Sequence, residues 1–396
     1  MNRLPLRTWL YFSAQSINLT TAVMSVTMAA AVGAALAPAV GWATVPYGVQ
    51  FLAMLLVTYP AAAVMRRVGR RAGFLLGAAA LAVAGVCGYL AVGRASFPGL
   101  ILSHGALGVY IAFANYNRFA ATDGLPAPLR PRALSLVVAG GVVAAVAGPL
   151  LVQGLRVVAG EVDFALCYLA FIGLAAGAAL IAWRLPANPV APASSGDTGG
   201  TFAQAPSARV YGTILLAALG YGVMNLLMVQ ASLQMAHQHQ GFEQVRLAIQ
   251  WHVLAMFVPS FFAGRLIQRF GSQAIASAGL VLLMATALLN LLAQGYEAMA
   301  AALVLLGIGW NFTYVGGGAL LAGMFPEGIG HRWQGINDTT IGLFAAAGAF
   351  LPSLLMAQVG WWHTNLGCVV IIAAVLLARG IGQCRVLIRA IRQPQA

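Results

Sequence analysis

Long apolar stretches recur along the whole chain, and they constrain the fold more than any other feature. A helix needs about 20 apolar residues to cross the roughly 30 Å hydrocarbon core of a bilayer. Only 7% of the residues are charged, against about 25% in a soluble domain. The sequence therefore predicts an all-α polytopic membrane protein. The twelve expected spans cover residues 10–32, 45–65, 72–92, 98–120, 133–155, 163–181, 211–235, 247–267, 274–292, 298–325, 336–359 and 362–387.

The basic residues indicate how these spans are oriented. All 21 of them are Arg. If both termini are cytoplasmic, only Arg94, Arg156 and Arg246 fall in outer loops, and the other eighteen fall on the inner side. This bias is the positive-inside pattern of membrane proteins. We therefore read the net charge of +13 as a topology signal. We expect a multi-pass protein of the bacterial inner membrane, surrounded by the lipid bilayer, with no nucleic-acid partner.

The spans fall into two halves. Residues 186–210 are rich in Pro, Ala, Ser and Gly, which is typical of a flexible linker. This cytoplasmic linker separates an N-terminal half, residues 1–185, from a C-terminal half, residues 211–396. Six spans, a linker and six more spans is the plan of parallel-repeat secondary transporters. The sequence has no phosphate-binding loop, catalytic dyad or zinc-protease motif, so we do not expect an enzyme.

The acidic residues bear on the driving force for transport. All eight fall in expected loops or at the ends of spans, whereas carboxylates at mid-membrane depth usually mark proton relays. A proton symporter that works through carboxylates is therefore disfavoured. The acidic residues are Asp123, Glu161, Asp163, Asp197, Glu243, Glu297, Glu327 and Asp338.

Two pairs of soft ligands lie in the seventh and eighth spans. Met224 and Met228 share one face of the seventh helix, and His252 and Met256 share one face of the eighth, because each pair is four residues apart. The depths of the two pairs agree within roughly 5 Å. Thioethers select Cu(I), and imidazole also suits copper. These residues predict a copper site in which copper is the cargo and not a prosthetic group. Packing of the Met pair and structural hydrogen bonding of His252 are the alternatives.

Further side chains are candidates for contact with the cargo. One set lies at the outer end of the seventh span, where a solvated loop is the alternative. The other lies inside the spans, where packing and hydrogen bonding between helices are the alternatives. The candidate access site is Met235, His237 and His239, and the accessory or substrate-contacting candidates are Met24, Met28, His104, Asn115, Arg118 and Asn311.

A loop motif occurs at matching places in the two halves. Arg67-Val-Gly-Arg-Arg follows the second span, and Arg269-Phe-Gly follows the eighth. This pattern resembles the G-x-x-x-D-R-x-G-R-R signature loop of the major facilitator superfamily, although Arg66 and Gln268 stand where that motif has Asp. The resemblance implies the fold of that superfamily, with 12 transmembrane helices in two pseudo-symmetric six-helix halves.

Four motifs together resemble the CcoA-like copper importers of that superfamily. They are the two soft-ligand pairs, Asn115-Tyr-Asn-Arg-Phe-Ala-Ala and Gly309-Trp-Asn-Phe. The resemblance implies copper import for assembly of cbb3-type cytochrome c oxidase, copper chaperones as partners, and ligand roles for Met224, Met228, His252 and Met256.

Two other functions stay open. Riboflavin-importing relatives resemble this branch and share the Met and His pairs, so an importer of a small organic solute such as riboflavin is the first alternative. Trp310 and Asn311 would contact that solute. A multidrug exporter is the second alternative, because Gly148-Pro149 faintly resembles an exporter signature.

Overall fold

The structure, a computed structural model, is almost entirely helical. Within the part of the chain that it describes, 11 helices are long and apolar enough to cross a membrane, or up to 12 if one bent pair is a single span. The predicted fold class is therefore confirmed. The linker expected at 186–210 lies outside the described residues except for 208–210, which begin a helix. The described residues are 4–121, 123, 125, 126, 129, 133, 136–158, 164–185, 208–324 and 330–392.

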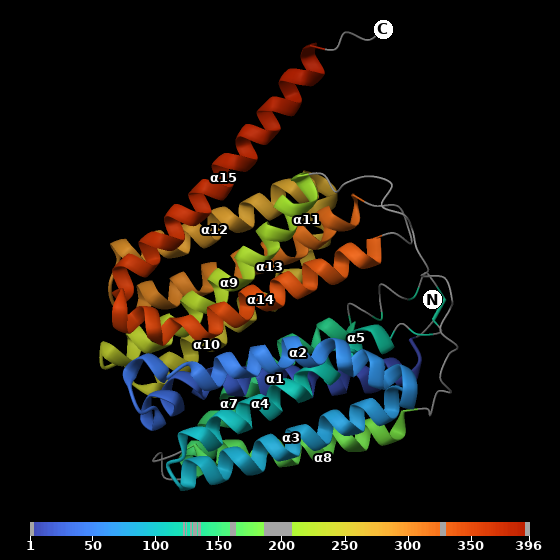
Figure 1. Cartoon of the computed structure of the whole chain (residues 1–396), viewed down its shortest axis with the longest axis vertical. Helices are drawn as coiled ribbons and strands as arrows, with labels where there is room; N and C mark the ends of the chain where they lie inside the picture. Colours follow the sequence, from blue (N-terminus) through green and yellow to red (C-terminus); the bar gives the residue numbers. More distant parts are fainter. Residues whose placement is uncertain are drawn as a thin grey trace.

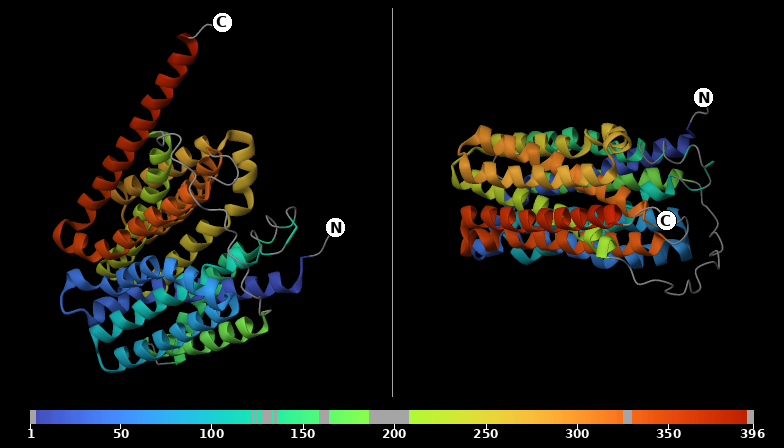
Figure 2. Two further views of the ribbon diagram at one scale, coloured as in Figure 1. Left: turned by 45° about the vertical axis from the view of Figure 1, so that its right-hand side comes forward. Right: turned by 90° about the horizontal axis from the view of Figure 1, so that it is seen from above.

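The helices form two bodies that lie side by side (Figure 1). The N-terminal half, in blue to green, contains α1 (Leu6–Leu36), η1 (Val40–Trp42), α2 (Val45–Val68), α3 (Arg70–Gly93), α4 (Phe97–Ala114), α5 (Asn117–Ala120), α7 (Gly140–Val158) and α8 (Ala165–Arg184). The C-terminal half, in yellow-green to red, contains α9 (Ala208–His237), α10 (Phe242–Phe257), α11 (Ser260–Phe270), α12 (Ser272–Leu292), α13 (Tyr296–Ala322), α14 (Gly330–Gln358) and α15 (Gly360–Arg392). The end of α15 projects beyond the other helices (Figure 2).

The eighth span is broken, which the apolar pattern did not predict. We expected one continuous helix over residues 247–267, but α10 ends at Phe257 and α11 begins at Ser260, with a bend of 44° between them. Pro259 stands at the break. Proline has no N–H and clashes with the preceding turn, so it ends or kinks a helix.

Small residues hold α13 close to two neighbours. A Cβ added at Gly307 would lie 2.5 Å from the backbone oxygen of His252 on α10. On α12, a Cβ at Gly279 would lie 2.6 Å from the backbone nitrogen of Thr313. Close backbone approach through small residues is the usual way that helices associate in lipid. We infer that α10, α12 and α13 form one rigid unit.

The two halves meet through polar contacts at the end of the molecule where η1 lies. The hydroxyl oxygens of Thr44 and Ser353 are 2.8 Å apart, and the Thr44 hydroxyl also donates to the backbone oxygen of Phe350 at 3.0 Å. The Ser353 hydroxyl donates to the backbone oxygen of Gly41 at 2.8 Å. Figure 1 shows the halves converging at this end and diverging toward the N-terminus. These contacts hold one end of the interface between the halves closed.

Candidate functional site at the interface of the two halves

Four aromatic side chains of the C-terminal half gather where it faces the N-terminal half. The rings of Trp310 and Tyr314 are stacked, with centroids 5.2 Å apart and an interplanar angle of 10°. Tyr221 packs edge-on against Trp310 at 5.5 Å, and Phe257 does so at 6.3 Å. Trp310 and Tyr314 share one face of α13 because they are four residues apart. We call these four residues the aromatic cluster.

Contacts across the interface place this cluster between the halves. A Cβ added at Gly141, on α7, would lie 2.5 Å from the ring of Phe257. From α5, the guanidinium of Arg118 interacts electrostatically with the side chain of Tyr314. The N-terminal half therefore reaches the aromatic cluster at two separate points.

Trp310 has an unused polar group. The side chain is only 7% exposed, and its Nε1 has no hydrogen-bond partner among the described residues. A buried indole usually finds an acceptor for this N–H. The aromatic cluster therefore combines flat apolar faces with a donor that a bound molecule could use.

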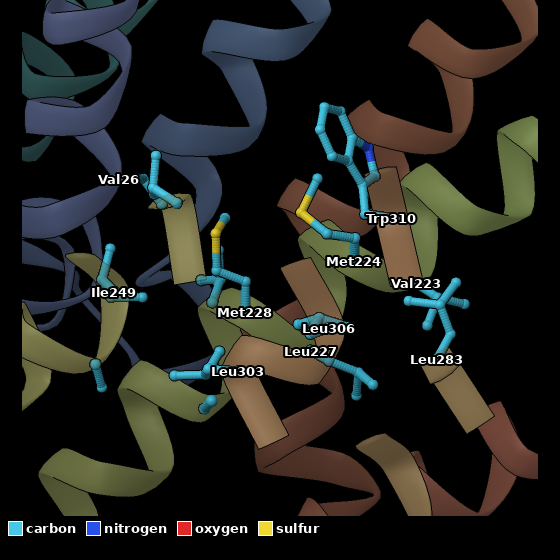
Figure 3. Close-up of a cluster of buried hydrophobic side chains, with 14 of the residues drawn as sticks. Val26, Val223, Met224, Leu227, Met228, Ile249, Leu283, Leu303, Leu306 and Trp310 are labelled. Carbon is cyan, nitrogen blue, oxygen red and sulfur yellow. The ribbon is translucent and has the colours of Figure 1, made fainter. Parts of the chain in front are cut away.

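The Met and His candidates lie in an apolar setting. Met224 and Met228 are buried in a hydrophobic cluster that draws on both halves, and Met256 packs against it. Figure 3 shows Met224 beside Trp310, with Met228 one helical turn away. Met224 and Met228 come from α9, whereas α10, which carries His252 and Met256, packs chiefly against α13 and α7. Packing thus accounts for the burial of both thioethers on α9.

His252 is the least satisfied member of this set. Its Nδ1 donates to the carbonyl oxygen of Leu303 at 2.7 Å. This bond leaves the lone pair of Nε2 free, and Nε2 is buried with no partner in the part of the chain that the structure describes. Such a nitrogen has the form of a metal ligand or of a hydrogen-bond acceptor. Across the described residues, no group of three His, Cys, Asp or Glu side chains gathers in a way that would hold a metal.

The other Met and His candidates are dispersed. Met24 and Met28 are fully buried in the core of the N-terminal half. The access-site residues differ in exposure, because Met235 is fully buried while His237 and His239 are exposed. A shared site of these three ligands at the outer mouth stays a prediction.

His104 belongs to a closed hydrogen-bond network inside the N-terminal half. Its Nδ1 lies 3.1 Å from Gln50 Oε1, and its Nε2 lies 3.1 Å from the Tyr168 hydroxyl. Gln50 Oε1 also accepts from the Ser25 hydroxyl at 2.6 Å. All four residues are buried. Both ring nitrogens of His104 are occupied, so the network fixes α1, α2, α4 and α8 together.

Asn311 links α13 to the break between α10 and α11. Its Nδ2 donates to the backbone oxygen of Met256 at 2.7 Å and to the Ser260 hydroxyl at 2.6 Å.

We expect Asn311→Leu to lower the free energy of unfolding by about 1–3 kcal/mol, because it leaves a buried carbonyl unpaired. Thermal unfolding of the purified protein in detergent measures this change. Thr340→Val removes an exposed hydrogen bond within α14. This control should change the free energy of unfolding by less than about 0.5 kcal/mol. Equal stability of the two variants would contradict a bracing role for Asn311.

Several residues of the site were not found from the sequence. Tyr221, Phe257 and Tyr314 were missed, although the spacing of four between Trp310 and Tyr314 was visible. Asn18 was also missed, and it contacts the candidate Asn115 with Nδ2 to Oδ1 at 3.2 Å. A polar amide in the middle of an apolar run was the available signal for Asn18.

Comparison with known proteins decides the family. Over 372 residues, the chain is 36% identical to the riboflavin transporter RfnT of Brucella anthropi, and the match covers 92% of each protein. The chain belongs to the major facilitator superfamily. The family description "Major Facilitator Superfamily" matches residues 210–384. The chain is also 28% identical over 317 residues to the uncharacterized MFS-type transporter YddS of Bacillus subtilis, covering 74% of this chain and 70% of that relative.

Solved structures of other transporters share the fold. A POT family transporter in complex with 5-aminolevulinic acid matches with a TM-score of 0.73 at 12% identity, covering 95% of this chain and 96% of that one. The xylose transporter XylE from E. coli, in an inward open conformation, matches with a TM-score of 0.66 at 13% identity, covering 93% and 94%. At these identities the likeness shows the fold alone.

Proposed function

We propose that this chain imports riboflavin, or a closely related flavin, by alternating access between its two halves. The observation that carries the proposal is the stacked Trp310–Tyr314 pair at the interface, with its unused indole N–H. A flat fused ring binds well against aromatic faces that are accompanied by a few polar groups. The identity of 36% to a protein named as a riboflavin transporter supports the same cargo. The chain then moves its substrate without transforming it.

The contacts between the halves bear on the side of the membrane to which this conformation is open. The arginine distribution favours cytoplasmic termini, so the contacts of Thr44 with Phe350 and Ser353 lie on the periplasmic side. With this orientation, the path would be closed to the periplasm in this conformation, and the halves would diverge toward the cytoplasm. The bacterial relatives favour the inner membrane as the location. Rocking of one half against the other about the interface would carry the cargo across.

Copper is the second candidate cargo, and the state of His252 favours it. Nε2 is buried without a partner in the described structure, on the helix that also carries Met256. Imidazole and thioether groups together suit copper. On this proposal copper is the substrate, Met224 and Met228 supply further sulfur ligands, and the imported copper serves cbb3-type oxidase assembly through copper chaperones.

Parallel uptake measurements separate the two cargoes. Cells with and without the protein are given radioactive riboflavin in one arm and radioactive copper in the other. We expect riboflavin accumulation to rise with expression and copper accumulation to stay unchanged. We also expect His252→Ala and Met228→Ala to leave copper accumulation at the background level, because no copper passes through the protein.

The opposite result would favour copper over riboflavin as the cargo. If expression raises copper accumulation, and His252→Ala and Met228→Ala abolish that rise at normal protein levels, copper is the cargo. Riboflavin that leaves preloaded cells faster when the protein is present would instead identify an exporter.

A further inference from the structure

A cluster of three amides lies on α1 and just beyond the C-terminal end of α4, in the N-terminal half. Asn18 Nδ2 lies 3.2 Å from Asn115 Oδ1 and 3.4 Å from Gln15 Oε1. We propose that this amide cluster binds the hydroxylated side chain of the transported flavin, while the aromatic cluster holds its ring. This inference rests on the proposed function and deepens it, because it assigns the two chemically different parts of one substrate to the two halves.

The amides have hydrogen-bonding capacity left over. Asn18 is only 1% exposed, yet its Oδ1 has no partner in the described part of the chain. Asn115 directs its Nδ2 to the sulfur of Met54 at 3.7 Å, and a thioether is a weak acceptor. Buried polar groups are normally satisfied, and an exception needs an explanation. A polyol chain supplies one, because each of its hydroxyl groups both donates and accepts.

Adjacent glycines on α7 connect the two clusters. A Cβ added at Gly140 would lie 2.8 Å from the Ser16 hydroxyl, next to Gln15. The following residue, Gly141, is the one that meets Phe257 of the aromatic cluster. Consecutive Cα atoms are about 3.8 Å apart. Ser16 on the helix of the amide cluster and Phe257 of the aromatic cluster therefore pack against adjacent residues of α7.

A second connection runs through Arg118. It follows Asn115 by three residues, and its guanidinium interacts electrostatically with the side chain of Tyr314. Tyr314 is stacked on Trp310. The amide cluster and the stacked rings are thus linked along α4, α5 and α13, and one extended molecule can touch both.

This arrangement predicts selectivity for the side chain of the flavin. A site that is built to hydrogen-bond hydroxyl groups discriminates against an analogue without them, because the buried polar groups are then left unpaired. Lumiflavin carries the same ring system as riboflavin with a methyl group in place of the polyol chain. The aromatic cluster accepts both molecules, whereas the amide cluster distinguishes them.

The test is a titration of the purified full-length protein with riboflavin and, separately, with lumiflavin. Binding is measured as the quenching of flavin fluorescence. Wild type is expected to bind riboflavin more tightly than lumiflavin. Asn18→Leu, which is similar in size, should weaken riboflavin binding about tenfold and leave lumiflavin binding within about twofold. Asn115→Ala, at a half-buried position, should shift the preference in the same direction. Asn290→Leu is the matched control, because that buried amide pairs with Asn365 on peripheral helices.

The outcomes separate this inference from the proposed function. Retained lumiflavin binding shows that a variant is folded. Two results for monodisperse amide variants would show that the amide cluster does not bind the side chain of the flavin, provided that wild type binds riboflavin. In the first, both variants bind riboflavin and lumiflavin as wild type does. In the second, both variants lose the binding of the two flavins equally. Failure of wild type to bind either flavin would instead overturn the proposed function, and this inference with it.

Discussion

Trp310→Ala is expected to lower riboflavin uptake about 5- to 150-fold, because removing an aromatic platform under a stacked ring costs about 1–3 kcal/mol. The stacked pair with Tyr314 and the edge contacts of Tyr221 and Phe257 all depend on this indole. The measurement is uptake of radioactive riboflavin at a concentration below half-saturation, in cells that make no riboflavin of their own.

Two controls accompany this change. Trp310→Phe keeps a flat ring but lacks the N–H, so it should retain more uptake than Trp310→Ala. Trp362→Ala removes a Trp that is 51% exposed on α15, and it should transport like wild type. If Trp310→Ala transports at the wild-type rate with a normal protein level, the aromatic cluster is packing and does not hold the cargo.

A second large effect is expected from locking the closed end of the interface. In the double variant Thr44→Cys with Ser353→Cys, the two sulfur atoms replace hydroxyl oxygens that are 2.8 Å apart, so a disulfide can form. Because transport requires the two halves to part at this end, oxidation should lower riboflavin uptake by at least about tenfold. Reduction with dithiothreitol should restore it. The measurement is uptake before and after each treatment in the same cells.

The single variants control for the cysteines that the chain already contains, which include Cys87, Cys167 and Cys368. Neither Thr44→Cys nor Ser353→Cys alone should respond to oxidation. Full uptake by a double variant whose disulfide has been verified by mass spectrometry would contradict alternating access through this interface.

Much of the fold could be predicted from the sequence because a membrane span has a simple requirement. About 20 apolar residues are needed for each crossing, and the apolar runs supplied them. The break at Pro259 was missed because apolar residues continue on both sides of it, and length alone favours one continuous helix. The proline was the available signal. The extension of α15 to Arg392 also exceeded the apolar run that predicted it.

The site was predicted less well, for reasons of helix arrangement. The spacings placed Met224 with Met228 and His252 with Met256, but they did not show that α10 would pack chiefly against α13 and α7. A helical period shows which side chains share a face and not which helix that face meets. The aromatic cluster uses one face each of α9, α10 and α13, so most of its members emerged only once those helices were placed.

The close packing of α13 bears on how the substrate itself takes part in the transport cycle. Gly307 and Gly279 hold α13 against α10 and α12, so the aromatic cluster moves with the C-terminal half as one body, whereas Asn18 and Asn115 move with the other half. A molecule that touches both clusters binds most strongly when they are at the right separation, and more weakly when they are apart. A ligand shifts a conformational equilibrium by its difference in affinity for the states. The cargo would then act as its own allosteric effector, favouring the conformation that encloses it and easing its release once the halves separate.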